Sequence, residues 1–220
     1  MPTSRPVVAA FDLDGTLTKG GSVVSWLRYV GGTRLVARSI GERLLPLAFG
    51  ALASGRAADE AKESLFRAVL CGRPYEEVQL RSAAFAQHHL ATELRSEIRD
   101  RLNWHLAEGH RVVVVSASPE IYVGVVAAML GAHGHVGTRL AVDPMGRLTG
   151  GYLGRNCRGR EKVRRLQAWI SEQDFGDVAP ELYAYGNSRG DRKMLGAAEH
   201  PYDVGQLGRL GALKAFPRLD

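Results

Sequence analysis

Cysteine is scarce in this chain. Only two of its 220 residues are cysteines, Cys71 and Cys157, and they lie far apart with no spacing typical of a metal site. Disulfides persist in oxidising compartments and are rare in reducing ones. We therefore expect two free thiols and a reducing compartment.

Long hydrophobic runs are also missing. Asp12 and Asp14 interrupt the apolar stretch near the N-terminus too early for a secretory signal peptide. The most lipid-like segment, LLPLAFGALA at residues 44–53, lies between Arg43 and Arg56 and is far shorter than the roughly 20 residues that span a bilayer. The sequence therefore predicts no transmembrane segment and a cytoplasmic protein.

Acidic residues are outnumbered in an otherwise ordinary composition. The 29 lysines and arginines against 23 aspartates and glutamates give a net charge of +6. This favours an anionic partner, without choosing among phosphate esters, nucleic acid and a membrane surface. A basic cluster stands out at residues 155–165, and a solvated helix face accounts for most of it.

Three short apolar runs each end in a polar turn. They are PVVAAFDLDG (6–15), RVVVVSASPE (111–120) and ELYAYGNSRGD (181–191). Apolar runs without alternation are typical of parallel strands that are covered on both faces. Helical segments separate them, so we expect an α/β fold with a Rossmann-like, doubly wound parallel sheet. The three polar turns would then gather at one edge of the sheet.

The stretch between the first two runs is too long for a single crossover helix. Helical periodicity covers residues 22–53, 56–70, 75–91 and 92–107. We expect the last to be the crossover helix, ended by Gly109, and the others to form an inserted all-helical cap. The predicted domains are a core of residues 1–20 and 92–220 and a cap of residues 21–91. The alternating stretch 136–154 predicts a β-hairpin.

Two aspartates follow the first predicted strand. Side chains two residues apart on an extended segment point the same way, so Asp12 and Asp14 can both face the space beyond the strand end. Paired carboxylates favour a hard divalent cation such as Mg²⁺, which also keeps waters and phosphate oxygens as ligands. The alternative for this pair alone is a turn or a helix cap.

Further candidates follow in the chain. Ser116 comes after the second strand, where the start of the next helix would suit a phosphate, although a serine there is also a common N-cap. Lys162 could neutralise an anionic transition state, or it could be an ordinary surface lysine. Asn187 and Asp191 follow the third strand and offer oxygen ligands, although Asp191 could simply cap a helix.

These residues together carry a family resemblance. FDLDGTLT, then Ser116 after VVVV, then Lys162, then GNSRGD resemble, in order and spacing, the four motifs of the haloacid dehalogenase superfamily. The closest resemblance is to its phosphoserine phosphatase-like branch, and it covers nearly the whole chain. The first motif alone would be only moderately specific.

The resemblance implies a Mg²⁺-dependent phosphatase that acts through an aspartyl-phosphate. Asp12 would be the nucleophile, and Asp14 the general acid and then the base. The other roles it implies are phosphate binding by Ser116, Ala117, Lys162 and Gly15, and metal binding by Asp12, Asp14 through its backbone carbonyl, Asn187 and Asp191. Asn187 departs from the pattern, because the family usually has aspartate there. We expect a tuned metal site, with a weakened site as the alternative.

The expected substrate is a small phosphorylated metabolite. Phosphoserine is suggested by the branch, and residues 44–53 leave room for a lipid-linked or amphipathic phosphate. Two alternatives stay open at this point. One is a phosphomutase, which would pass the phosphoryl group to a hydroxyl instead of to water. The other is a non-catalytic phosphate or nucleic-acid binding protein, but nucleic acid is not the expected partner, because such a protein would not need Asp12, Asp14, Ser116 and Lys162 together.

Overall fold

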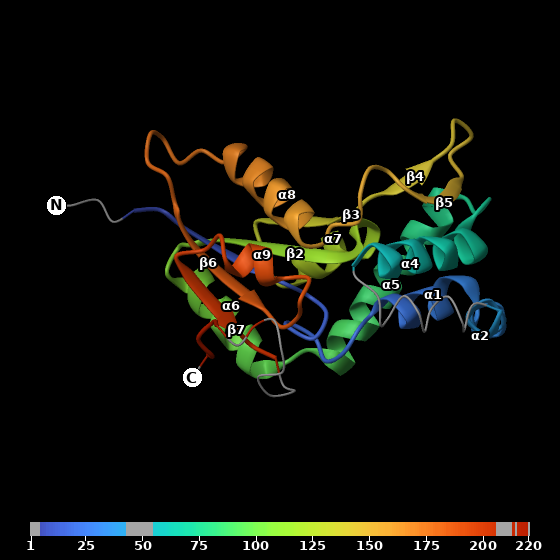
Figure 1. Cartoon of the computed structure of the whole chain (residues 1–220), viewed down its shortest axis with the longest axis horizontal. Helices are drawn as coiled ribbons and strands as arrows, with labels where there is room; N and C mark the ends of the chain where they lie inside the picture. The colour runs from blue at the N-terminus through green and yellow to red at the C-terminus, as the bar shows by residue number, and fades with distance from the viewer. Residues whose placement is uncertain (1–4, 43–54, 206–212, 214, 220) are drawn as a thin grey trace.

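A five-stranded parallel sheet forms the centre of the molecule. The computed structural model describes residues 5–42, 55–205, 213 and 215–219. The strand order is β3-β2-β1-β6-β7, and every pairing within this sheet is parallel (Figure 1). The strands are β1 (Val7–Phe11), β2 (Arg111–Pro119), β3 (Gly134–Thr138), β6 (Glu181–Gly186) and β7 (His200–Asp203).

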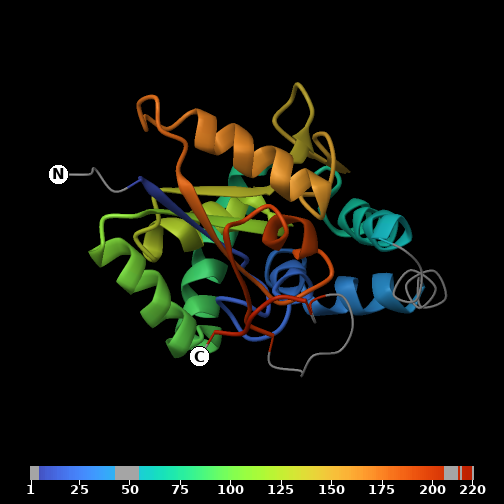
Figure 2. The same ribbon diagram turned by 60° about the vertical axis from the view of Figure 1, so that its left-hand side comes forward.

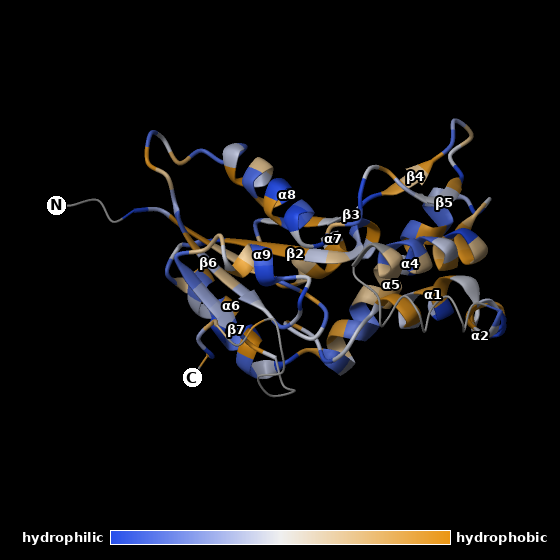
Figure 3. Cartoon of the chain, in the orientation of Figure 1, coloured by the Kyte–Doolittle hydropathy of each residue, from blue (hydrophilic) through white to orange (hydrophobic). Residues whose placement is uncertain are grey.

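Helices cover both faces of the sheet. Successive residues of a strand point to opposite faces, so apolar side chains of the central strands need cover on each side. Ala10 packs in one apolar cluster with Leu166 of α8, whereas Phe11 packs in another with Leu102 of α6 and Tyr122 of α7. Figure 2 shows α8 and α6 on opposite sides of the sheet, and Figure 3 shows hydrophobic residues on the central strands. The expected doubly wound α/β fold is therefore confirmed. The covering helices are α6 (Ser96–Ala107), α7 (Glu120–Met129), α8 (Arg160–Ser171) and α9 (Arg192–Leu195).

The segment expected to form a cap is helical in its described part. It contains α1 (Val23–Gly31), α2 (Thr33–Gly41), α4 (Gly55–Leu70) and most of α5 (Tyr75–Glu93). These helices lie together beside the carboxyl end of the sheet (Figure 1). Residues 43–54, which include the lipid-like stretch 44–53, lie outside the described residues. The division into a core and a cap that begins at residue 21 and ends at residue 91 stays a prediction. Among the described residues, no helix is long and apolar enough to cross a membrane.

The predicted hairpin is shorter than expected. An antiparallel pair, β4 (Leu140–Val142) and β5 (Leu148–Tyr152), turns at residues 143–146, where Asp143 Oδ1 accepts backbone hydrogen bonds from Met145 at 2.9 Å and Arg147 at 2.8 Å. Residues 136–138 belong instead to β3 of the main sheet. Sequence alternation did not distinguish the end of a buried strand from the start of a hairpin.

Helix α4 rests directly on β5. A Cβ added at Gly150 would lie 2.4 Å from the Cα of Arg67 on α4, and the φ of Gly150 is +78°. Only glycine combines this backbone conformation with so close an approach. The hairpin thus supports the helix that brings Lys62 and Asp59 toward the sheet.

Candidate active site

Three polar segments meet at the carboxyl edge of the sheet, as predicted. Asp12 follows β1, Ser116 lies in the carboxyl-terminal half of β2, and Asn187 follows β6. Strand β1 lies between β2 and β6, so the segments are neighbours in space. Parallel strands end at the same edge, which is where open α/β sheets bind their ligands.

Lys162 joins two aspartates from different segments. Its Nζ lies 2.6 Å from Oδ1 of Asp12 and 2.5 Å from Oδ1 of Asp191. All three side chains are buried, and Lys162 is only 1% exposed. Lys162 reaches this position from the first turn of α8, so it is not the surface lysine that the sequence left as an alternative.

Charge is unevenly balanced in this cluster. Burial and the neighbouring charge of Asp191 raise the pKa of Asp12 above its ordinary value, although Lys162 opposes the shift. Burial alone would lower the pKa of Lys162, but the two carboxylates outweigh it and raise that pKa. Two buried carboxylates thus share one ammonium, and the site has an excess of negative charge that a divalent cation would compensate.

The second oxygen of Asp12 faces a different group. Thr16 Oγ1 lies 3.0 Å from Oδ2 of Asp12 and 3.4 Å from Oδ1 of Asn187, so two potential ligand oxygens converge beside one hydroxyl. Gly15 has a φ of +78°, and a Cβ there would lie 2.0 Å from Nδ2 of Asn187. A glycine at position 15 therefore lets Asn187 approach the loop after β1.

Mg²⁺ fits this donor set. Asp12 Oδ2, the Asn187 amide oxygen and the Asp14 backbone carbonyl are all hard oxygen donors, and Mg²⁺ usually retains several waters as well. Within the described residues, no group of three or more His, Cys, Asp or Glu side chains is placed to hold a metal ion. A metal here would accordingly need the amide and backbone oxygens in addition to Asp12.

Asp191 has protein partners on both carboxylate oxygens. Its Oδ1 contacts Lys162, and its Oδ2 accepts hydrogen bonds from the Ser188 backbone at 3.0 Å, the Ser188 hydroxyl at 2.6 Å and the Asn187 backbone at 3.3 Å. Asp191 thus orders the loop after β6 and orients Lys162. Its role as a metal ligand stays a prediction.

Asp14 is held apart from Asp12. The backbone N–H of Ser22 donates to its Oδ1 at 2.6 Å, and the hydroxyl of Ser118 donates to its Oδ2. Ser22 also shares a 2.7 Å hydrogen bond with the hydroxyl of Tyr122. The two aspartates therefore point toward different partners, as groups with separate chemical roles would.

Ser116 does not begin a helix, contrary to the expectation. Strand β2 continues through Pro119, and α7 begins only at Glu120. Pro119 favours an extended conformation at the residue before it and is itself extended, with a ψ of 128°. The Oγ of Ser116 accepts a hydrogen bond from the Ser118 backbone at 3.0 Å, which leaves its own proton free for another acceptor.

Sequence reasoning missed several contacts of this site. Thr16 lay within the first motif but was not assigned a role, and Ser118 lies two residues after Ser116 on an extended segment, so the strand period could have indicated it. Ser22 comes from a distant part of the chain, and so do Lys62, whose Nζ donates to the Ala117 carbonyl oxygen, and Asn156, which Lys62 also contacts. No local pattern marked these three residues.

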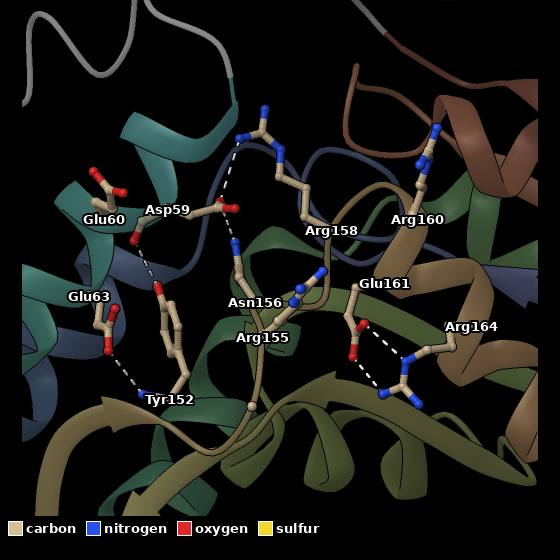
Figure 4. Close-up of a pocket in the computed structure, with 11 residues that line it drawn as sticks. Asp59, Glu60, Glu63, Tyr152, Arg155, Asn156, Arg158, Arg160, Glu161 and Arg164 are labelled. Carbon is tan, nitrogen blue, oxygen red and sulfur yellow. Dashed lines mark hydrogen bonds and ion pairs between the residues drawn. The ribbon is translucent and has the colours of Figure 1, made fainter.

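A cavity lies beside the site, between α4 and the loop that precedes α8 (Figure 4). Its volume is about 740 Å³. Arg155, Arg158, Arg160 and Arg164 line it together with Asp59, Glu60, Glu63 and Glu161. The basic cluster is thus accompanied by acidic groups, in contacts such as Arg164 with Glu161 at 2.7 Å and Arg158 with Asp59 at 3.7 Å. This pairing reduces the positive surface that a nucleic-acid partner would need.

The fold and these motifs define a hydrolase family. The family model described as haloacid dehalogenase-like hydrolase matches residues 9–196. The chain belongs to this family. Two of its homologues, each aligned with 90% of this chain, bear phosphatase names.

The chain is similar to two proteins of related sequence and to a solved structure. It is 34% identical over 195 residues to Protein CicA of Caulobacter vibrioides, covering 89% of this chain and 84% of that protein. It is 25% identical over 202 residues to a histidinol-phosphatase of Neisseria meningitidis, covering 90% and 89%. A substrate-bound phosphoserine phosphatase matches the fold with a TM-score of 0.60 and 20% identity, covering 92% of this chain and 87% of that chain.

Proposed function

We propose that the protein is a Mg²⁺-dependent phosphomonoesterase that works through an aspartyl-phosphate. The observation that carries the proposal is the buried arrangement of Asp12, Lys162 and Asp191, with Asp14 bound separately by Ser22 and Ser118. One carboxylate is thus fixed by a cation, and a second is available for proton transfer.

The first step is attack of an Asp12 oxygen on phosphorus. A bond forms between that oxygen and phosphorus, and the bond from phosphorus to the leaving oxygen breaks. Asp14 gives its proton to the leaving oxygen. In the second step Asp14 takes a proton from water, whose oxygen attacks phosphorus and releases inorganic phosphate and Asp12.

The remaining residues hold the phosphoryl group. The free hydroxyl proton of Ser116 would be donated to a phosphoryl oxygen, with the backbone N–H groups of Ala117 and Gly15 as further donors. Lys162 would neutralise charge on the phosphoryl group while it keeps Asp12 in place. Mg²⁺, held by Asp12, Asn187 and the Asp14 carbonyl, with Asp191 in support, would offset charge that develops on phosphate oxygens.

Helices α1, α2, α4 and α5 are proposed to act as the cap that selects the leaving group. Support comes from Ser22, just before α1, which bonds Asp14, and from Lys62 on α4, which reaches the core. The relatives named above include a histidinol-phosphatase and a phosphoserine phosphatase. We therefore propose to screen phosphate esters of amino alcohols first among small phosphorylated metabolites, and amphipathic phosphates next. The free thiols Cys71 and Cys157 support the cytoplasm as the proposed location.

Removal of divalent metal is expected to abolish hydrolysis of a generic aryl phosphate. The two carboxylates and the substrate dianion carry more negative charge than Lys162 can compensate, so the reaction needs a second cation. The measurement is release of the aryl alcohol and inorganic phosphate from chelator-treated protein before and after addition of Mg²⁺. Equal rates in metal-free and Mg²⁺-loaded protein would refute the proposal. Transfer of phosphate to an added sugar in place of water would favour a mutase.

Changes at Asn187 are expected to alter the Mg²⁺ requirement. Asn187→Asp adds a negative charge beside the metal and should lower the Mg²⁺ concentration that gives half-maximal activity, while the protein stays active. Asn187→Ala deletes an oxygen ligand and should raise that concentration by about 10-fold. A magnesium titration of activity checks both. If Asn187→Ala titrates like the parent, Asn187 is not a ligand.

A further inference from the structure

We propose that Lys62, on α4, is a positioning residue for Ser116, and that it acts through the peptide group between Ala117 and Ser118. The inference rests on the proposed function, because Ser116 is taken to bind the phosphoryl group. It adds a specific link between the cap and the phosphate site.

One peptide group connects the two side chains. Lys62 Nζ donates to the carbonyl oxygen of Ala117 at 2.7 Å. The N–H of the same peptide group belongs to Ser118, and it donates to Oγ of Ser116 at 3.0 Å. A cation at the carbonyl end polarises the peptide and strengthens the N–H as a donor. Lys62 therefore favours the Ser116 rotamer that keeps the hydroxyl proton free for substrate.

Thr138 cannot replace Lys62 as a donor. Its hydroxyl lies 2.6 Å from the Ala117 carbonyl and 2.8 Å from Oδ1 of Asn156, but it has only one proton to give. Lys62 reaches both acceptors, since its Nζ also lies 2.8 Å from Oδ1 of Asn156. Without the lysine, one of these two oxygens would lose its donor.

The surroundings of Lys62 are specific for a cation. Its Nζ lies 5.6 Å from the ring centre of Phe66 and 5.7 Å from that of Tyr152, distances that suit a cation–π contact. The charged and titratable groups that act on it are Asp59 on its own helix, Asp14 after β1, and Cys157 and Arg158 in the loop before α8. An apolar side chain of the same length could fill this space without a desolvation cost, so the ammonium is best explained by the two carbonyl groups it binds.

The hydrogen bond from Lys62 to the Ala117 carbonyl oxygen depends on pH. Burial lowers the pKa of Lys62 to about 8, although Asp59 and Asp14 act in the opposite direction. The ammonium is therefore present below this pH and is lost as the pH rises through it. A neutral amine makes weaker hydrogen bonds to carbonyl oxygens. Lys62→Arg keeps its charge over this range, so it is the conservative variant for a comparison.

The first test needs no turnover. In ¹⁵N-labelled protein, the Ser118 amide proton resonance should move in Lys62→Met and should titrate near pH 8 in the parent but not in Lys62→Arg. Arg67→Met, an exposed change on the same helix, should leave it in place. Thermal unfolding shows whether each variant is folded. An unchanged Ser118 resonance in folded Lys62→Met would overturn the inference.

The second test is a double-mutant cycle on inorganic phosphate binding and on kcat/KM for an aryl phosphate. With Ser116 present, Lys62→Met should weaken phosphate binding by about 10-fold and lower kcat/KM by about 10-fold, the size expected for loss of a hydrogen bond to a charged group. It should have less than about 2-fold effect in the Ser116→Ala background, because the residue it positions is gone. Lys62→Arg should recover part of the loss.

The two hypotheses fail in different ways. Equal factors for Lys62→Met in both backgrounds would show that Lys62 acts independently of Ser116 and would overturn the inference, even with an active parent. An inactive parent would refute the proposed function, whereas the Ser118 resonance and the phosphate-binding cycle would still decide the role of Lys62.

Discussion

Asp12→Asn is expected to lower kcat/KM for phosphate-ester hydrolysis by at least about 10⁴-fold, because an amide cannot accept the phosphoryl group. The fold should survive, since asparagine has the same shape and Lys162 keeps its contact with Asp191 at 2.5 Å. Asp12 is buried next to a second carboxylate, so removing its charge should not lower the free energy of unfolding in metal-free buffer. Steady-state kinetics and urea unfolding measure the two effects.

The matched control is Asp100→Asn, which makes the same chemical change at an exposed position of α6. It should leave both activity and stability close to those of the parent. Substantial turnover by purified Asp12→Asn would show that Asp12 is not the nucleophile. A large loss of stability would mean that the inactivity reflects unfolding.

Lys162→Met is expected to remove activity and also to destabilise the fold. The change leaves Asp12 and Asp191 buried without their shared cation, and breaking a buried ion pair from one side typically costs about 3 to 5 kcal/mol. Adding Mg²⁺ should recover part of the stability, because the metal compensates the same charge. The double variant Lys162→Met/Asp191→Asn should also be more stable than Lys162→Met alone, because one of the two buried charges is removed. Urea unfolding with and without Mg²⁺ measures both effects.

Lys193→Met, an exposed lysine on α9, is the control for a lost positive charge. Its free energy of unfolding should match that of the parent within about 0.5 kcal/mol. If Lys162→Met were equally stable, the contacts of Lys162 with the two carboxylates would not form in solution.

The sequence predicted the sheet and the gathering of its polar turns for a clear physical reason. Runs such as Val112–Val115 are apolar on both faces, which suits only a strand covered from both sides, and parallel strands share one carboxyl edge. This shared edge is enough to predict that three residues lie close together, namely Asp12, Ser116 and Asn187. The excess of helix between β1 and β2 likewise indicated an insertion.

The orientation of individual side chains was not predictable in the same way. Ser116 lies within a strand because Pro119 delays the next helix, an effect that the expectation of a helix start overlooked. Lys62 approaches Ala117 from α4, a helix that rests on Gly150 of β5 through a contact between distant segments. The engagement of Asp191 with Ser188 depends on the loop conformation, which the motif alone does not define.

The most direct test of the central claim is to find the phosphoryl group on the protein during turnover. The protein is mixed with a radiolabelled aryl phosphate and Mg²⁺, quenched in acid at a series of short times, and digested into peptides. The account predicts a hydroxylamine-sensitive label on the peptide that contains Asp12, and no label in Asp12→Asn. Label on another residue, or turnover with no label on Asp12 at any time, would contradict it.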